Sequence, residues 1–545
     1  MAFANPARDL VSRTWLPALL LLLFAAQSLW FTGTQSLTYD EPAHIIAGAE
    51  AWRDGKFEHW NDHPPLGRLW LSLPLVGSHP VFAWHQLPIG FRVTEMQPGP
   101  VAIAWRTRPM NILLGLLLGM AIWFAGRKLF SVEAANTALA LFAFTPSLIA
   151  HSSLATTDII GALFIFLSAF QLVRWRHDPT IRNMLLMGVC LGGLLLSKFY
   201  APPLVVLALG LMLVSKTDGI TPPQRWNWKQ TGAALLVALA VWWAGYFFHV
   251  SRVDIGSGKV VASFPNRPVK EWATKSQVQL KLMVPAGEFL EGLREVAFTN
   301  KRGRTAWFLG EIYPKGRIAL YYPVAIVLKW PTVLLAMFFA SLGFGALRSC
   351  RASGDLLLLC LFGMVYLAFA LRSGYDIGER HILPLYPFAL LIAGGIWEVA
   401  RRHRAGIAVL MLALCLNAAD ALRYAPGYLS YFNIFVKPEN SWRLLTDSNL
   451  DWGQGLIALR HYEQEHPGEA LRLAYFGSVD PALYGVRSLP LSPGEQVRGR
   501  IVIGATCLSG QTLEDPSSYH WLWSYAPQQV IDHAMWMFDA GNQPQ

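Results

Sequence analysis

The chain has 545 residues, of which 53% are hydrophobic and 15% are charged, and its formal net charge is +10. Soluble domains carry about 25% charged residues, so this composition excludes an ordinary soluble protein. Much of the positive charge lies in short loops between apolar runs, where it orients membrane proteins, so it does not indicate nucleic-acid binding. Four of the five cysteines lie in or beside apolar runs, so we expect no structural disulfide.

Apolar runs of roughly 17 to 25 residues recur in the chain, and each is long enough to cross a bilayer. The first run could be a signal peptide, but we interpret it as an uncleaved anchor because an acidic pair follows it at once. We expect about eleven membrane-spanning helices. They are residues 15–31, 110–125, 132–150, 154–173, 184–196, 201–214, 231–248, 318–342, 356–371, 382–399 and 406–422.

The segment 184–214 decides the topology, because it could be one long helix or two. A Ser-Lys-Phe stretch at residues 197–199 and a proline pair at residues 202–203 favour a break. With two spans, the basic residues of alternate short loops all lie on one side, as the positive-inside bias requires. That topology places four segments on the outer face: residues 40–68, the turn before Asp158, the loop 251–317 and everything after residue 422.

The outer loop 251–317 carries 12 Lys and Arg residues against 6 Asp and Glu residues. A basic loop beside a membrane can hold phosphate groups or lie on anionic lipid. The alternative is a merely solvated loop, which is the simpler interpretation for most of these charges.

The outer segment 40–68 contains acids, histidines and prolines in a short space. Asp40 and Glu41 come just after the first apolar run, and a helix would place His44 on the same face as Asp40. Asp62 and His63 follow, ahead of a stiff proline pair. Such residues at a membrane surface can form a catalytic pocket. The alternative is that Asp40 only caps a helix and that the rest is solvated loop.

This segment resembles the first outer loop of the protein O-mannosyltransferase family. That family has an Asp-Glu pair and then Asp-x-His-Pro-Pro-Leu-Gly-Lys, whereas residues 62–68 read Asp-His-Pro-Pro-Leu-Gly-Arg. The bacterial aminoarabinose transferases have a similar loop with Glu-Lys-Pro-Pro. Both groups belong to the GT-C superfamily of transferases that use polyprenyl-phosphate sugars. Residues 305–331 also resemble a stretch that recurs in bacterial members.

The resemblance implies a polytopic α-helical membrane protein with the GT-C glycosyltransferase fold. It implies an inverting enzyme that moves a sugar, mannose or another hexose, from a polyprenyl-phosphate carrier to a hydroxyl of a protein or glycan outside the cytoplasmic (inner) membrane. Such a transfer needs a base, groups that hold the leaving phosphate, and shelter from water. Asp40 matches the family's first-loop acid and is the expected base, and we expect Glu41 to orient it or to contact the acceptor.

Two residues at outer span ends match further positions of the superfamily. Asp158 matches an acid after the third span, although it could simply begin a helix. Lys198 matches a lysine near the donor phosphate, although a lysine at a span end can snorkel to the surface.

A third outer junction, at residues 378–387, contains Arg380 and His381. The pattern Arg-x-Leu-Leu-Pro-x-Tyr-Pro is common in these transferases. An arginine can clamp a phosphate with two parallel hydrogen bonds, and a histidine can donate one. The alternative is that both residues are interfacial anchors.

A metal site is chemically possible in the first outer loop. Asp40, His44, Asp62 and His63 are all metal-ligand types. The O-mannosyltransferases are thought to work without a metal, so we expect no obligatory metal or other cofactor, and we assign Asp62 and His63 to substrate binding. The expected partners are the lipid-linked donor, the acceptor and membrane lipids, and not nucleic acid.

The composition changes at residue 424, where polar residues, Gly and Pro become more frequent. We therefore divide the chain into a transmembrane module, residues 1–423 with outer catalytic loops 34–107 and 251–317, and an outer α/β domain, residues 424–545. Residues 471–476 and 500–505 are predicted strands, and residues 456–464 a predicted helix. Residues 447–454, Asp-Ser-Asn-Leu-Asp-Trp-Gly-Gln, recur in bacterial relatives. They begin like a calcium loop, but the turn glycine and the bidentate glutamate are missing.

Two other functions remain open at this stage. An aminoarabinose-type transferase would modify a lipid such as lipid A, and Asp62-His63 in place of Glu-Lys counts against it. A transporter or membrane scaffold would place ionisable residues mid-span and show an internal repeat. Here the charges gather at one set of span ends.

Overall fold

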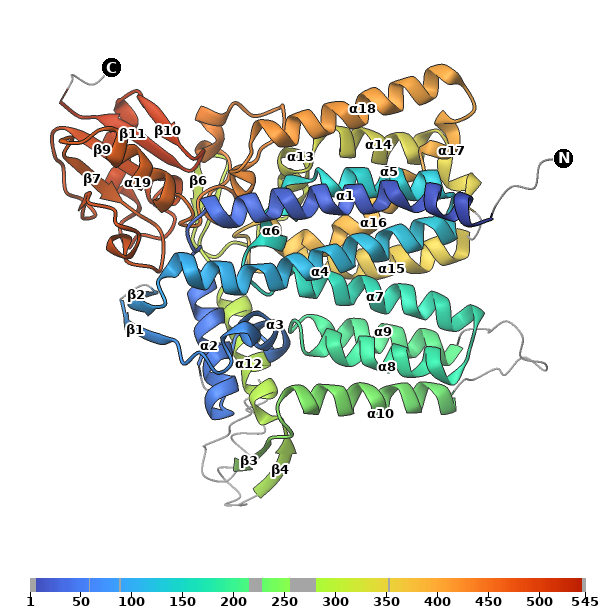
Figure 1. The fold of residues 1–545 in the computed structure, drawn as a ribbon. Coiled ribbons are helices and arrows are strands. Elements are labelled where there is room, and N and C mark those ends of the chain that lie inside the picture. Colours follow the sequence, from blue (N-terminus) through green and yellow to red (C-terminus); the bar gives the residue numbers. More distant parts are fainter. Residues whose placement is uncertain are drawn as a thin grey trace.

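The computed structural model of the chain describes residues 6–57, 59–87, 90–214, 228–254, 281–350 and 353–541. Its main body is a bundle of helices that run roughly side by side (Figure 1). The bundle consists of α1 (Pro6–Thr34), α4 (Pro100–Leu129), α5 (Val132–Ala143), α6 (Pro146–Ser153), α7 (Asp158–His177), α8 (Ile181–Leu195), α9 (Ala201–Val214), α10 (Trp228–Gly245), α13 (Tyr321–Lys329), α14 (Thr332–Gly343), α15 (Ser353–Ala370), α16 (Tyr386–Gly394), α17 (Trp397–Ala400) and α18 (Arg404–Arg423).

Six helical segments of the described chain are long and apolar enough to cross a membrane, and eight are if each of two bent helix pairs counts as one span. The chain is therefore a multi-pass membrane protein. The six are Trp15–Thr34, Pro100–Leu129, Asp158–His177, Ser353–Ala370, Glu379–Ala400 and Arg404–Arg423. The expected number of about eleven spans stays a prediction, because helices such as α8 and α9 fall short of that length.

Two expected spans are bent rather than straight. The segment 318–342 forms α13 and α14, which meet at 109°, and the segment 132–150 forms α5 and α6, which meet at 65°. Pro331 directly precedes α14, and Pro146 is the first residue of α6. Proline lacks a backbone N–H and clashes with the preceding turn, so a helix cannot continue straight through either position. The expected span over residues 318–342 is therefore broken into two helices, and it counts as one span only if the bent pair crosses the membrane together.

The expected break in the segment 184–214 is confirmed. Helix α8 ends at Leu195 and α9 begins at Ala201, and the two lie side by side in Figure 1. Lys198 occupies the turn between them. This turn lies at the same end of the bundle as the start of α7.

The elements outside the bundle gather at one end of it, away from the N-terminus (Figure 1). Residues 255–280 of the expected basic loop lie outside the described residues. The described helices at this end are α2 (Glu41–Asp54), α3 (Pro65–Ser72) and α12 (Gly287–Arg302). Three antiparallel strand pairs lie there as well: β1 (Val81–Gln86) with β2 (Phe91–Gln97), β3 (Val250–Asp254) with β4 (Lys281–Pro285), and β5 (Ala306–Phe308) with β6 (Glu311–Tyr313).

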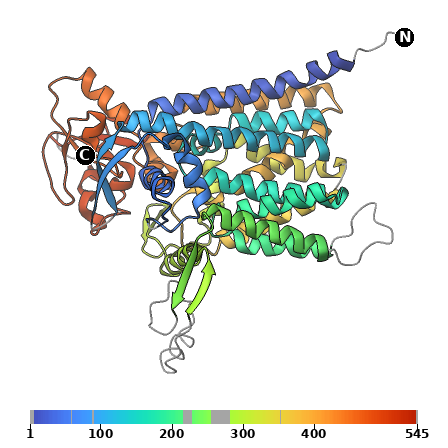
Figure 2. The same ribbon diagram turned by 60° about the horizontal axis from the view of Figure 1, so that its bottom comes forward.

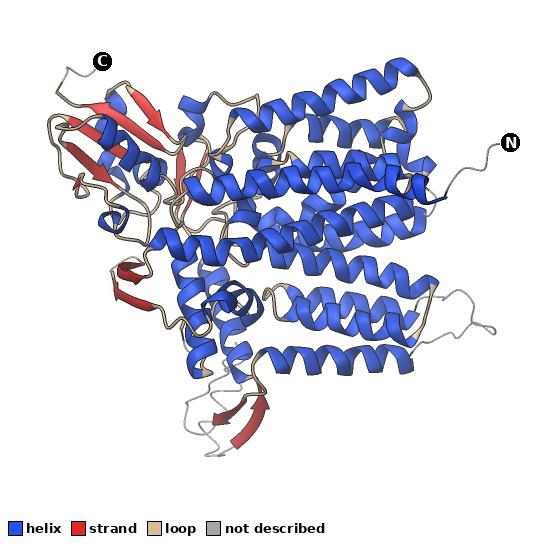
Figure 3. Ribbon diagram, in the orientation of Figure 1, coloured by secondary structure: helices blue, strands red, loops and turns tan. Residues whose placement is uncertain are grey.

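The chain after α18 forms a mixed five-stranded sheet with short helices around it, visible at the left of Figure 3. The strand order is β10-β11-β9-β7-β8; β7 pairs in parallel with β8 and β9, and β11 is antiparallel to β9 and β10. The expected strands and helix are present as β7, β9 and α19. The strands and α-helices of this C-terminal region are β7 (Leu471–Ala474), β8 (Leu489–Pro490), β9 (Arg500–Gly504), β10 (Gln529–Ile531), β11 (Met535–Asp539), α19 (Leu456–Glu465) and α20 (Ala505–Leu508).

This C-terminal region is hydrogen-bonded directly to the chain that leaves α1. Ser36 donates its backbone N–H to the carbonyl of Gln454 at 2.8 Å, and Tyr39 donates its N–H to the carbonyl of Trp452 at 2.8 Å. Ser478 donates its hydroxyl to the carbonyl of Tyr39 at 2.6 Å. The turned view in Figure 2 shows the C-terminal sheet at the same end of the bundle as α2. The C-terminal region therefore closes over the first outer loop.

Candidate active site

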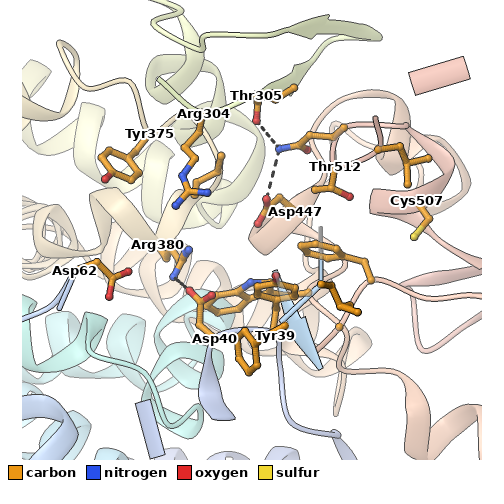
Figure 4. Close-up of a pocket in the computed structure, with 18 of the residues that line it drawn as sticks. Tyr39, Asp40, Asp62, Arg304, Thr305, Tyr375, Arg380, Asp447, Cys507 and Thr512 are labelled. Carbon is orange, nitrogen blue, oxygen red and sulfur yellow. Dashed lines mark hydrogen bonds and ion pairs between the residues drawn. The ribbon is translucent and has the colours of Figure 1, made fainter. Parts of the chain in front are cut away.

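A cavity of about 1620 Å³ lies between the span ends and the C-terminal region, and Figure 4 shows part of its lining. Its described lining residues include parts of the first outer loop, β2, α12 and α15, the starts of α7 and η3 (Glu379–Leu385), the turn before α9, and the C-terminal region. Seven of the eight expected site residues line it. They are Asp40, Asp62, His63, Asp158, Lys198, Arg380 and His381.

Asp40 stands immediately before α2, but its side chain turns away from that helix. Within α2, all of which the structure describes, no backbone N–H donates to the Asp40 carboxylate. Instead, Asp40 Oδ2 accepts a hydrogen bond from Arg380 Nη1 at 2.8 Å (Figure 4). The alternative in which Asp40 only caps a helix is therefore wrong. The side chain is 26% exposed and faces the cavity.

Arg380 connects the first outer loop with the start of α7. Its Nη1 lies 2.8 Å from Asp40 and 3.8 Å from Asp158 Oδ2. Its guanidinium carbon lies 4.2 Å from the centre of the Trp452 ring, which is a cation–π contact. An arginine buried between two carboxylates and an indole face is held in one place, unlike an anchor at a membrane surface.

Lys198 and Asp158 form a second buried ion pair at the cavity wall. Lys198 Nζ donates to Asp158 Oδ1 at 2.8 Å, and the two side chains are 11% and 3% exposed. Lys198 therefore does not snorkel to the surface. Asp158 does begin α7, as the alternative interpretation expects, but its carboxylate is used in ion pairs rather than in capping.

Asp62 and His63 line the cavity beside Arg68. Arg68 Nη2 donates to Asp62 Oδ1 at 2.9 Å, and His63 Nδ1 lies 3.2 Å from the same oxygen. Burial alone would raise the pKa of Asp62, but His63 and Arg68 outweigh it and hold that pKa below its usual range. Burial lowers the pKa of His63, and Lys198 adds to this effect. The result is an ionised carboxylate beside a histidine that favours its neutral form.

His44 lies behind His63 and is not among the described residues that line the cavity. The two imidazole rings meet edge to face with their centres 4.8 Å apart, and Arg68 Nε donates to His44 Nδ1 at 3.4 Å. Among the described residues, no group of three or more His, Cys, Asp or Glu side chains is arranged to hold a metal ion. The expectation that no metal is required stays a prediction.

Glu41 is the one expected site residue that is not among the described cavity-lining residues. Its carboxylate is fully buried and accepts two hydrogen bonds from Arg108, at 2.8 Å each, through Nε and Nη2. The backbone N–H groups of Thr38 and Ala155 donate to it at 2.7 and 2.6 Å. Glu41 therefore points into the protein and joins the first outer loop to α4. The expectation that it orients Asp40 or contacts the acceptor stays a prediction.

His381 is half-buried at the cavity wall and packs near Tyr375, with ring centres 5.9 Å apart, and its Nε2 atom is buried. Its Nε2 has no hydrogen-bond partner among the described residues. A buried ring nitrogen without a protein partner can bond to a bound substrate.

The C-terminal wall of the cavity contains residues that the sequence interpretation did not assign to the site. Asp447, Trp452 and Gln511 all line the cavity. Asp447 and Trp452 belong to the segment 447–454, whose recurrence in bacterial relatives was the available signal. The segment is held by the buried Lys329, which donates to the carbonyl of Asn449 at 2.6 Å. These contacts join residues more than a hundred positions apart, so no local pattern predicts them.

Residues 99–244 match the family described as dolichyl-phosphate-mannose-protein mannosyltransferase. None of the curated proteins matches the sequence. Among solved structures, the S. cerevisiae Pmt1-Pmt2 protein O-mannosyltransferase complex bound to the sugar donor is similar, with 12% identity, a TM-score of 0.52, and coverage of 78% of this chain and 90% of that chain.

Two further solved structures are similar at lower TM-scores. ArnT from Cupriavidus metallidurans bound to undecaprenyl phosphate has 12% identity and a TM-score of 0.49, over 99% of this chain and 100% of that one. The Archaeoglobus fulgidus oligosaccharyltransferase has 12% identity and a TM-score of 0.43, over 94% of this chain and 72% of that one. Residues 99–244 thus resemble the dolichyl-phosphate-mannose-protein mannosyltransferase family, and the chain shares the fold of the Pmt1-Pmt2 complex.

Proposed function

We propose that this protein is an inverting glycosyltransferase. It moves a sugar from a polyprenyl-phosphate carrier to a hydroxyl of a protein or glycan acceptor on the outer side of the cytoplasmic membrane. The observation that carries the proposal is the chain of contacts from Asp40 through Arg380 and Asp158 to Lys198 in one cavity at the span ends. This chain of contacts places a carboxylate base next to two cations, at a position that a lipid phosphate can reach from the membrane.

In this mechanism, Asp40 accepts the proton of the acceptor hydroxyl while that oxygen bonds to the anomeric carbon. The bond between the anomeric carbon and the phosphate oxygen breaks on the opposite face, and the electron pair leaves with the phosphate. Arg380 and Lys198 stabilise the negative charge that grows on the phosphate. The products are a glycosylated acceptor with inverted configuration and polyprenyl phosphate.

Asp158 and Trp452 support these roles. Asp158 contacts both cations and sets their separation across the cavity wall. Trp452 covers the guanidinium face of Arg380, which keeps its N–H groups directed along the cavity wall. Both effects orient groups before the substrate binds, which lowers the barrier to transfer.

The description of the matching family favours mannose as the sugar, and the yeast complex was solved with its sugar donor. A lipid acceptor, as in the aminoarabinose-type alternative, would use the same base and cations. The GT-C fold argues against the alternative of a transporter or scaffold.

The direct test supplies the purified protein with radiolabelled polyprenyl-phosphate sugars of different kinds, together with peptide, glycan and lipid A acceptors. We expect label to move to a peptide or glycan from a hexose donor, with or without a metal chelator. An Asp40→Asn variant serves as the inactive control. Transfer from an aminoarabinose donor to lipid A would replace the proposed acceptor, and consumption of no donor by the wild type would contradict the proposal.

The orientation is tested separately. In intact cells, single cysteines at Glu514 in the C-terminal region and at Arg402 beside α17 should differ in their reaction with a membrane-impermeant thiol reagent. We expect labelling at Glu514 and protection at Arg402. The reverse pattern would place the cavity on the cytoplasmic side.

A further inference from the structure

The segment 447–454 contains two buried aspartates whose surroundings differ. Asp451 Oδ1 accepts the backbone N–H of Gly453 at 3.2 Å, and its Oδ2 accepts that of Thr506 at 3.1 Å. Asp451 is not among the described residues that line the cavity. Both of its oxygens hold the local backbone together, so its role is structural.

Asp447 lies four residues earlier and faces the cavity. Its Oδ1 accepts the backbone N–H of Ser448 at 2.6 Å. The hydrogen bond that the described residues provide to Oδ2 is a long one, from Gln511 Nε2 at 3.4 Å. A carboxylate oxygen can accept two hydrogen bonds, so Oδ2 has capacity for a donor that enters the cavity.

The backbone at Asp447 is also unusual. Its φ is +57°, in the left-handed region that side-chain-bearing residues adopt at a cost. Such strain persists where the surrounding structure enforces it, and it is concentrated at functional sites. Burial raises the pKa of Asp447 to about 6, with Arg380 acting against the rise. Burial of a carboxylate oxygen that has only a long hydrogen bond, as Oδ2 has, is costly and needs an explanation.

The position of Asp447 identifies which substrate it faces. Figure 4 shows Asp447 across the cavity from Asp62, with Asp40 and Arg380 between them. The proposed function assigns the donor phosphate to Arg380 and Lys198, at the span ends. Asp447 belongs to the opposite, C-terminal wall, which also contains Gln511, so we assign the space in front of it to the acceptor.

The wall around Asp447 has the composition of a carbohydrate site. Tyr475 and the stacked pair of Tyr39 and Phe476 line the same cavity as the carboxylate of Asp447 and the amide of Gln511. Aromatic faces with a few placed polar groups suit a sugar ring. A peptide that binds by adding a strand needs a free sheet edge, and the edge strand β8 beside the cavity contains Pro490, which has no N–H.

We propose that Asp447 is an acceptor-binding residue: it accepts a hydrogen bond from a second hydroxyl of a carbohydrate acceptor, next to the hydroxyl that Asp40 deprotonates. This proposal rests on the proposed function, because it takes Asp40 as the base. It names the acceptor class, a glycan with neighbouring hydroxyls, and assigns its subsite to the C-terminal wall.

The test compares Asp447→Asn with the matched control Asp451→Asn. Asparagine tolerates a positive φ, so the first substitution keeps the backbone conformation and removes the charge. A charge-assisted hydrogen bond contributes enough that its loss should raise the acceptor KM about tenfold or more, with the donor KM unchanged. Asp451→Asn should lower the melting temperature, because its amide NH₂ would face the backbone N–H of Thr506, which now donates to a carboxylate oxygen. It should leave the acceptor KM unchanged. Asp447→Gly, which suits the same φ, provides a second variant without a carboxylate.

A binding measurement separates this proposal from the proposed function. Saturation-transfer NMR with methyl α-D-mannoside and with N-acetylserinamide reports acceptor binding without turnover. We expect the mannoside to bind to wild type and to Asp451→Asn, and to bind at least tenfold more weakly to Asp447→Asn and Asp447→Gly. Three results would overturn the proposal. They are equal mannoside binding by all variants, no mannoside binding to wild type, and binding of the serine probe alone. If the mannoside binds as expected but wild type does not turn over any donor, the result would contradict only the proposed function.

Discussion

Arg380 donates a hydrogen bond to Asp40 across 340 positions of sequence, with Nη1 2.8 Å from Oδ2. The arginine belongs to η3 at a span end, whereas the aspartate precedes α2 in the first outer loop. The contact therefore holds the expected base next to the expected phosphate ligand before any substrate arrives. In the proposed mechanism Asp40 serves the attacking oxygen and Arg380 the leaving phosphate of the same anomeric carbon. Both groups must therefore be held in fixed positions relative to each other.

Replacing Asp40 with Asn tests the base. The amide keeps the size of the carboxylate and its oxygen can still accept from Arg380, but it cannot take the proton of the acceptor hydroxyl. We expect a protein that folds and binds the donor normally, with turnover reduced by about 10² to 10⁴. Single-turnover transfer measured at saturating donor checks this. Near wild-type transfer would move the role of base to another acid, with Asp158 the first candidate.

Glu41→Gln should affect stability rather than chemistry. The substitution leaves the Arg108 guanidinium buried without its counter-charge, since both side chains are fully buried. Breaking a buried ion pair from one side costs about 3–5 kcal/mol. We expect a clear fall in the melting temperature in detergent, with turnover per folded molecule close to wild type. Normal stability combined with lost turnover would return Glu41 to the catalytic group.

Arg380→Ala and Lys198→Ala should each weaken donor binding. A charge-assisted hydrogen bond contributes roughly 1.5–3 kcal/mol, which corresponds to an affinity loss of about tenfold or more. Arg423→Ala is a suitable control, because Arg423 is an exposed cation at the end of α18. Equilibrium binding of a polyprenyl-phosphate sugar distinguishes the variants. Unchanged affinity in both test variants would reduce Arg380 and Lys198 to structural ion pairs.

The sequence predicted the helical body and seven of the residues that line the cavity, because both depend on local patterns. Apolar runs mark the helices, and polar residues at their ends mark where the cavity forms. The adjacent acids could not be told apart in this way. Asp40 faces the cavity while Glu41 turns inward, and the difference is made by Arg108, which reaches Glu41 from α4.

The sequence also did not show that residues of the C-terminal region line the cavity, because contacts between distant parts of the chain place them there. Asp447 and Trp452 reach the cavity because Lys329 and the first outer loop hold their segment in place. Each of these contacts joins distant parts of the chain, and the resemblance of separate segments to known families does not show which of them touch. The bends at Pro146 and Pro331 were readable in principle, since proline interrupts a helix. The length of the apolar runs outweighed that signal.

The last prediction concerns the pH dependence of stability. Asp532 Oδ1 accepts a hydrogen bond from Gln35 Nε2 at 3.1 Å, which ties the β10–β11 turn to the end of α1, while its Oδ2 is buried without a partner among the described residues. Burial raises the pKa of Asp532 from its ordinary 3.8 to about 7, with the Gln35 hydrogen bond acting against the rise. The folded protein therefore binds this proton more tightly than the unfolded chain. Its contribution to stability is complete below pH of about 4 and is lost as the pH rises towards 7.

Asp532→Asn removes this titration and keeps an oxygen that can accept from Gln35. We expect the melting temperature of the variant, measured relative to wild type in detergent, to be higher at pH 8 than at pH 5. Asp447 and Asp451 also have raised pKa values and give wild type a slope of the same sign. They are present in both proteins, so their effect cancels in the difference. A difference in melting temperature that is the same at both pH values would show that Asp532 does not carry this proton in the folded protein.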